Sequence, residues 1–114
     1  MAGMIKRLAG PLALTNTYGT DIYVPPSALK YSVIRMIHVA NKSASAATFR
    51  LYLGATTATA AGTELYYDVS VPVGSYVDLP LYLKVASTDF LVGGASAATA
   101  LSITVMGEEH VVPS

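Results

Sequence analysis

The stretch SVIRMIHVAN, residues 32–41, decides the fold class. Apolar and β-branched residues fill both its odd and its even positions, a composition typical of a β-strand. A regular strand of this sequence has two mostly apolar faces and is covered on both sides. A β-bulge near Arg35 instead brings Ile34, Ile37 and Val39 to one face and turns Arg35 outward. Both interpretations stay open, and both make this stretch a β-strand.

Period-2 alternation continues along the chain, and no stretch shows helical spacing. Further strands are predicted at residues 12–18, 21–24, 48–53, 64–71, 76–85, 88–92 and 101–106. Pro80 places its strand at a sheet edge or at a bulge, because proline donates no hydrogen bond to a ladder. With about seven or eight strands separated by turn signals, we expect an all-β chain, a single antiparallel β-sandwich or jelly roll.

The first eleven residues are predicted to lie outside this sandwich. We expect residues 1–11 to form an extended, irregular N-terminal arm and residues 12–114 to form the β-sandwich domain. Lys6 and Arg7 precede a short apolar run, as in an export signal, but Gly10 interrupts that run. An export signal is therefore not expected.

Three connecting segments consist mainly of Ala, Ser, Thr and Gly, at residues 43–47, 54–63 and 93–100. Their side chains are too small to wall a pocket with aromatic rings. They suit loops that pack closely against a neighbour or lie on an open surface. The sequence ASAAT occurs at residues 44–48 and again at 95–99. Because the segment has low complexity, we interpret the repeat as a coincidence rather than as a duplicated half-sandwich.

Charged residues are scarce. The 114 residues are 53% hydrophobic and 12% charged, with a formal net charge of +0 and no cysteine, whereas an average soluble domain is about 25% charged. The lack of cysteine excludes disulfides and thiolate metal sites, and the lack of excess positive charge argues against nucleic-acid binding. Residues 90–107 carry no charge, but their glycine pair and alternation predict a loop and a strand, not a membrane span. With so few charges, we expect part of the surface to be buried against other chains in a homo-oligomer or larger assembly.

The charges divide unevenly between the two halves of the sequence. Residues 1–50 carry six basic residues and one acidic residue, and residues 51–114 carry one basic and six acidic residues. Folding that interleaves the two halves cancels this asymmetry. Otherwise the molecule is polar, and its basic end docks on an acidic surface. Both alternatives stay open.

No combination of residues matches a catalytic constellation, so we do not expect an enzyme. His38 sits in an apolar strand, where a hydrogen-bonded histidine or one at a subunit contact is the expected state. Glu108 and His110 share one face of an extended chain, but a dedicated metal site needs more ligands than these. We therefore expect no metal and no cofactor.

The chain has eight tyrosines. Alternation predicts that Tyr52 and Tyr66 point outward and that Tyr67 points inward. Outward tyrosines anchor protein interfaces, and they also stack on sugars.

Several sequence runs match a pattern of known proteins. They are IYVPP at residues 22–26, VIRMIHVAN at 33–41, AATFRLYLG at 46–54, a leucine and aspartate element at 83–91 and TVMGE at 104–108. Over about residues 20–109, these runs resemble small β-sandwich virion proteins of tailed bacteriophages.

The resemblance implies a capsid decoration (cement) protein that binds the major capsid protein, stabilises the head and resides in the virion after synthesis in the host cytoplasm. Such proteins are often trimers and often clamp capsid subunits through N-terminal arms, so a homo-oligomer, as a trimer, is expected. The expected capsid contacts are Met4, Ile5, Lys6 and Arg7. The expected subunit contacts are Met36, His38 and Tyr66. The alternatives are a tail, neck or fibre component with the same sandwich, and a carbohydrate-binding module for host attachment.

Overall fold

The computed structural model describes residues 5–25, 30–54 and 62–111. These residues form eight β-strands, and no helix occurs among them. No described segment is therefore a helix that is long and apolar enough to cross a membrane. The strands are β1 (Ile5–Ala13), β2 (Thr20–Tyr23), β3 (Lys30–Asn41), β4 (Ala47–Gly54), β5 (Glu64–Val71), β6 (Tyr76–Val85), β7 (Phe90–Ala95) and β8 (Leu101–Val111).

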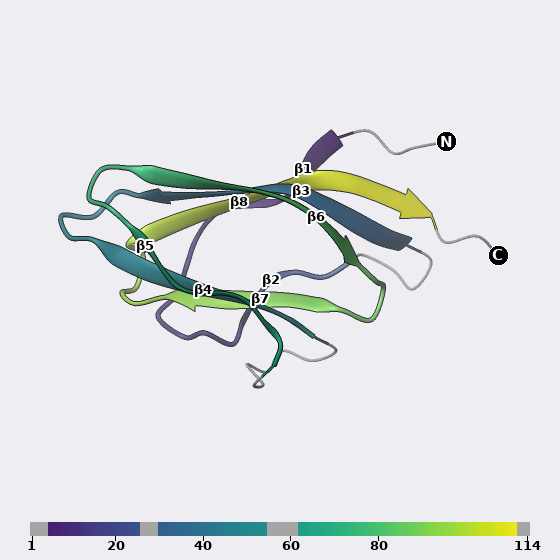
Figure 1. Ribbon diagram of the computed structural model, residues 1–114, viewed down its shortest axis with the longest axis horizontal. Coiled ribbons are helices and arrows are strands. Elements are labelled where there is room, and N and C mark those ends of the chain that lie inside the picture. The colour runs from purple at the N-terminus through teal and green to yellow at the C-terminus, as the bar shows by residue number, and fades with distance from the viewer. Residues whose placement is uncertain (1–4, 26–29, 55–61, 112–114) are drawn as a thin grey trace.

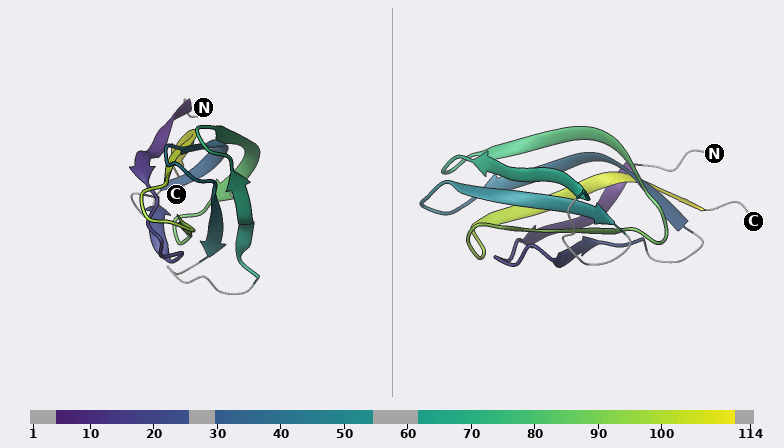
Figure 2. Two further views of the ribbon diagram at one scale, coloured as in Figure 1. Left: turned by 90° about the vertical axis from the view of Figure 1, so that its left-hand side faces the viewer. Right: turned by 60° about the horizontal axis from the view of Figure 1, so that its bottom comes forward.

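The strands pair into two antiparallel sheets that lie face to face (Figure 1). Sheet A has the strand order β1-β8-β3-β6, and sheet B has the order β2-β7-β4-β5. The chain passes repeatedly from one sheet to the other, and this strand order is that of the eight-stranded jelly roll. The predicted all-β sandwich is thereby confirmed. Seen end-on, β1 and β2 lie on one flank of the sandwich, and β5 and β6 lie on the other (Figure 2).

Apolar side chains between the two sheets form one core. Sheet A contributes Ile37 and Ile103, and sheet B contributes Phe49 and Leu91, all fully buried. Because side chains alternate between the two faces of a strand, each sheet offers one apolar inner face to the other. The burial of these faces is what holds the sheets together.

The central strand β3 contains the β-bulge. Its register shifts between Ile34 and Met36 relative to both neighbouring strands, β6 and β8. Ile34, Ile37 and Val39 are fully buried, whereas Arg35 is exposed. The bulge changes the phase of the alternation, so that one face collects the apolar side chains. Of the two interpretations of this stretch, the bulge is confirmed.

β1 corrects the expected N-terminal arm. Residues 5–11, expected to be irregular, pair with β8, and the strand ends at Ala13 instead of continuing as predicted. Leu8 packs against the core, which explains why this segment joins the sheet. Gly10 has a φ of 80°, and a side chain there would collide with the backbone oxygen of Ile103. A boundary after residue 11 therefore falls inside a strand, not between an arm and a sandwich.

β7 corrects a second expectation, because it runs through the glycine pair that we expected to form a loop. The strand therefore lies further along the chain than predicted. A side chain on Gly93 would meet the carbonyl oxygen of Arg50, and a Cβ on Gly94 would lie 2.5 Å from the carbonyl oxygen of Thr17. These glycines thus serve close packing inside a strand rather than a turn.

Candidate interaction surface

The described residues hold no group of three or more histidine, aspartate or glutamate side chains placed to bind a metal. Every buried side-chain nitrogen or oxygen in the same part of the chain has a hydrogen-bond partner. The features that remain as candidates are the outer faces of the two sheets and a hollow between two loops.

The outer face of sheet A carries two of the predicted subunit contacts. Met36 and His38 are half-buried there, opposite Met106 and Thr104 of β8. Nδ1 of His38 lies 2.5 Å from Oδ1 of Asp78 on β6. The centre of this face therefore combines two methionines with a histidine whose ring contacts the carboxylate of Asp78.

Two tyrosines on β6 extend this face. Tyr76 is 59% exposed and Tyr82 is 76% exposed. The ring of His38 lies 5.1 Å from that of Tyr76, and the guanidinium of Arg35 lies 5.0 Å from the ring centre of Tyr82. Large aromatic side chains with this exposure serve as anchors in protein contacts. The outer face of sheet A is therefore the best candidate interaction surface in the described part of the chain.

A charged network borders this face where β1 begins and β8 ends. Nη1 of Arg35 donates to Oε2 of Glu108 at 2.8 Å, and Nε2 of His110 lies 3.0 Å from Oε1 of Glu108. The hydrogen bonds from His110 and Arg35 lower the pKa of Glu108. The ring of Tyr31 stacks on His110 with centres 5.0 Å apart. The network fixes the side chains at this end of the sheet.

Ion pairs show how the uneven charge distribution is resolved. Glu109 lies 3.3 Å from Nζ of Lys30 and 3.5 Å from Nζ of Lys6. Burial raises the pKa of Glu109, but these two lysines lower it by more. Among the described residues, lysine and arginine side chains form ion pairs with carboxylates in the pairs Lys6–Glu109, Lys30–Glu109, Arg35–Glu108 and Arg50–Asp68. Each of these pairs joins a basic residue of residues 1–50 to an acidic residue of residues 51–114. The two halves of the sequence therefore interleave, which was the first of the two alternatives.

The predicted capsid contacts fall at the start of β1. Met4 lies outside the described residues. Ile5 begins the strand opposite Glu108, and Lys6 and Arg7 are exposed. A contact made through these residues is therefore a contact through the edge of sheet A.

Tyr66 does not lie on the outer face of sheet A, and its predicted outward orientation is wrong. It belongs to sheet B and packs against the core, with its ring 6.4 Å from that of Phe49. Its neighbour Tyr67 points outward and is 55% exposed. The register between β4 and β5 shifts between Phe49 and Leu51, and Asp68 has a φ of 52°. This irregularity exchanges the sides of Tyr66 and Tyr67, while Leu65, Val69 and Val71 keep their predicted core side. The three predicted subunit contacts therefore do not lie together.

The two tyrosines on which the carbohydrate-binding alternative depends, Tyr52 and Tyr66, are not accessible to a sugar. Tyr52 is only 4% exposed, and Tyr66 faces the core. Stacking on a sugar needs an accessible ring face, and these two side chains do not offer one.

A second cluster, on the outer face of sheet B, was not anticipated from the sequence. The guanidinium of Arg50 lies 4.3 Å from the ring centre of Tyr18 and 4.1 Å from that of Tyr67. Its Nε donates to Oδ1 of Asp68 at 2.6 Å, and its Nη2 donates to Oδ2 at 3.2 Å. The hydrogen bond with Asp68 raises the pKa of Arg50 and lowers the pKa of Asp68. Because these groups satisfy one another, the cluster ties a loop to two strands.

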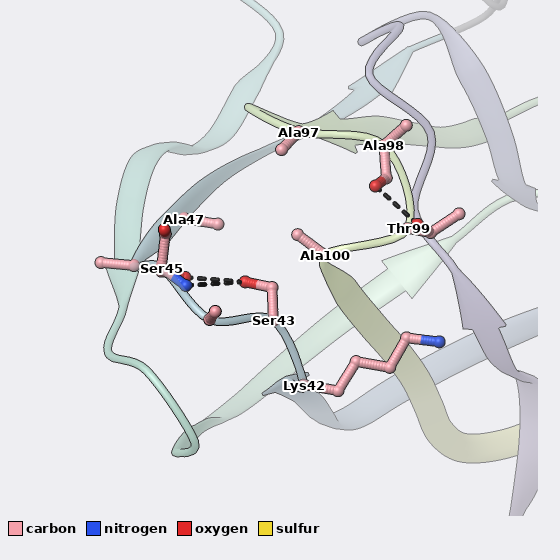
Figure 3. A pocket seen from close by; sticks show the side chains of 10 residues that line it. Lys42, Ser43, Ser45, Ala47, Ala97, Ala98, Thr99 and Ala100 are labelled. Atoms are coloured by element: carbon pink, nitrogen blue, oxygen red, sulfur yellow. Dashed lines mark hydrogen bonds between the residues drawn. The ribbon is translucent and has the colours of Figure 1, made fainter.

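Two loops enclose a hollow of about 400 Å³ at the end where β3 ends and β8 begins (Figure 3). Residues 42–47 and 97–100 line it, so both copies of ASAAT contribute. The backbone N–H of Thr48 donates to Oγ of Ser96 at 3.0 Å, and the N–H of Ser96 donates to the carbonyl oxygen of Thr48 at 2.8 Å. Lys42 is the one charged residue of the lining, and the rest are Ala, Ser and Thr. Such a lining offers few groups that would fix a small molecule.

Comparisons with known proteins support the fold. No protein family model matches the sequence, and no curated protein matches it. A protein of Bacillus endospore appendages, which form disulfide-linked pili, is similar over 98% of this chain and 90% of its own, with a TM-score of 0.55 and 15% identity. The coat protein of tobacco streak virus is similar over 99% of this chain and 87% of its own, with a TM-score of 0.49 and 9% identity. A pentameric capsid protein from metagenomic phage sequences is similar over 92% of this chain and 60% of its own, with a TM-score of 0.37 and 20% identity. The likeness to the appendage protein shows a common fold, and a fold does not determine function.

Proposed function

We propose that this chain is a structural protein of a virion, a decoration protein that binds the major capsid protein of a tailed bacteriophage and stabilises the head. The observation that carries the proposal is the outer face of sheet A, where Met36 is half-buried and the aromatic rings of Tyr76 and Tyr82 are largely exposed. A small domain with such a surface is suited to contact with other chains. The sequence runs that resemble phage virion proteins point to the kind of assembly, and jelly rolls are common in viral capsids.

In this proposal, the two groups of predicted contacts have different roles. Met36 and His38, on the outer face of sheet A, contact other copies of the chain in a homo-oligomer, expected to be a trimer. Ile5, Lys6 and Arg7, on the edge strand β1, contact the capsid shell. A rigid sandwich that bridges neighbouring shell subunits needs no catalytic group, because many weak contacts made together hold it in place.

Binding to undecorated capsids tests the proposal. Deleting residues 1–10 would remove most of β1, so the charge reversal Arg7→Glu is the better variant. We expect the wild-type protein to sediment saturably with capsids of the phage that encodes it and to raise their resistance to heat. We expect Arg7→Glu to bind more weakly, and Asp21→Lys, an exposed charge reversal on β2, to bind like the wild type. The absence of saturable binding by the wild-type protein would overturn the proposal.

The location on the virion is tested separately, because the fold does not fix it. Antibody-labelled virions imaged by electron microscopy show which part carries the protein. Label on the heads supports decoration, and label on tails, necks or fibres assigns the chain to those parts. Disulfide linkage, as in the pili of the appendage protein, has no counterpart here, because the chain has no cysteine.

A further inference from the structure

Along the flank formed by β6, the core is only partly covered. β6 is an outer strand of sheet A, so one of its edges has no neighbour among the described strands (Figure 2). Its core-facing side chains Val77, Leu79, Leu81 and Leu83 stay partly exposed, whereas Ile37 on the adjacent β3 is fully buried. The apolar core therefore reaches the surface along this strand.

The opposite side of β6 carries one acidic and one basic residue. Asp78 is held by His38, but its side chain is still 45% exposed. Lys84 is exposed and has no carboxylate within ion-pair distance among the described residues, although its Nζ lies 4.9 Å from the ring centre of Tyr31. Charges and a proline on an edge strand oppose indiscriminate pairing with other strands. Pairing is then favourable only in a register that matches the charges.

We propose that β6 pairs antiparallel with β6 of a second copy of this chain, about a two-fold axis at Leu81. In this register Asp78 lies opposite Lys84 of the second copy, and the same pair forms again on the other side of the axis. Of all antiparallel two-fold registers, this one sets the only acid of β6 opposite its only base. Leu79 then lies opposite Leu83, and Pro80 lies opposite Tyr82.

The register also covers the exposed side chains of the flank. On the inner side, Leu79, Leu81 and Leu83 of the two copies meet and extend both cores across the axis. On the outer side, Tyr82, which is 76% exposed, gains the ring of Pro80 as a partner. Pro80 donates no backbone hydrogen bond, so the apolar contacts outweigh the ladder in holding the strands together. The contact is isologous and closed, and it leaves the centre of the outer face of sheet A free for other partners.

The β6 pairing rests on one part of the proposed function, the association of several copies of the chain. Because the chain has no cysteine, a single introduced cysteine reports the register. The two Leu81 Cα atoms would be about 4.5–5.5 Å apart, within the range of a disulfide. The two Tyr76 Cα atoms would be about 33 Å apart at the usual rise of a strand. We expect Leu81→Cys to form a disulfide dimer under mild oxidation, and we expect the more exposed Tyr76→Cys not to do so.

A charge exchange tests the same register without oxidation. Lys84→Asp and Asp78→Lys should each weaken the β6 contact and give a smaller assembly in sedimentation velocity, because like charges then face each other. An equimolar mixture of the two variants should restore it, because each acid again faces a base. Cross-linking of Tyr76→Cys as readily as Leu81→Cys, or a mixture that sediments no faster than the separate variants, would overturn the pairing. Capsid binding by a protein that gives no Leu81→Cys dimer overturns the β6 contact and leaves the proposed function standing.

Discussion

Asn41, the last residue of β3, is 4% exposed and holds the loop that follows it. Its Nδ2 donates to the carbonyl oxygens of Ser45 at 2.9 Å and Val71 at 3.0 Å. Its Oδ1 accepts from the backbone N–H and from Oγ of Ser43, both at 2.8 Å. Asn41→Ala removes all of these bonds. Water can replace the side chain at the partly exposed Ser43 and Ser45, but the carbonyl of Val71 is buried.

The cost follows from these partners. Water replaces some of the bonds, at a net cost of about 0.5–1 kcal/mol, and a buried carbonyl left unpaired costs about 1–3 kcal/mol, so the total loss is about 1.5–4 kcal/mol. With an unfolding entropy of about 2.1 cal/mol/K per residue and 114 residues, the melting temperature Tm should fall by about 6–17 °C. Asn41→Asp keeps the shape but turns an acceptor toward two carbonyl oxygens, so we expect at least the same loss.

Urea and thermal unfolding followed by circular dichroism measure this loss. Lys42→Ala is the matched control, because Lys42 is the next residue and is exposed. It should stay within about 0.5 kcal/mol of the wild type. If Asn41→Ala also unfolds within that margin, the hydrogen bonds of Asn41 do not stabilise the fold, and the reasoning about this loop is refuted.

Three further outcomes are expected. Gly94→Ala should lower the yield of folded protein, because its Cβ would lie 2.5 Å from a backbone oxygen. Gly54→Ala should fold, because the nearest atom that its Cβ would meet is in a side chain 3.5 Å away. Equal yields of the two variants would contradict the packing of β7. Tyr66→Ala should unfold at lower urea than Tyr67→Ala, since only Tyr66 packs against the core; the reverse order would restore the sequence-based orientation. The folded-state pKa of Glu108 lies below its ordinary 4.5. Its contribution to stability is therefore present above about pH 4.5 and is lost as the pH falls through the lowered pKa. Over this acid range, the Tm of Glu108→Gln should fall less than the Tm of the wild type.

Alternation in the sequence was enough to find most of the fold. The strands Glu64–Val71 and Tyr76–Val85 have the bounds predicted for them, and the bulge at Arg35 was one of two interpretations. What failed depends on partners far away in the sequence. β1 forms because β8 offers it an edge, and the glycines of β7 fit because other backbones approach them. Local periodicity does not contain this information.

The residues of the candidate surface also divide into those that local alternation placed correctly and those that it did not. Met36 and His38 could be placed on one outer face because a regular alternation follows the bulge. The orientation of Tyr66 could not be predicted, because the register shift beside Asp68, whose φ is positive, lies inside a strand of uninterrupted pattern. The cluster around Arg50 had no signal in the sequence, since one of its partners lies in a loop that had been predicted as part of a strand.

The small number of charged residues also determines which interactions stabilise the pairing of β6 and which select its register. β6 carries only one acidic and one basic residue, Asp78 and Lys84. An exposed ion pair such as Asp78 with Lys84 contributes about 0–1 kcal/mol, too little to join two copies. Burial of apolar surface contributes about 25 cal/mol per Å², and the partly exposed leucines of β6 provide that surface. The leucines therefore supply the free energy of pairing, and the charges select the register. Like charges that face each other oppose the other registers, and charges on an edge strand in this way guard it against aggregation.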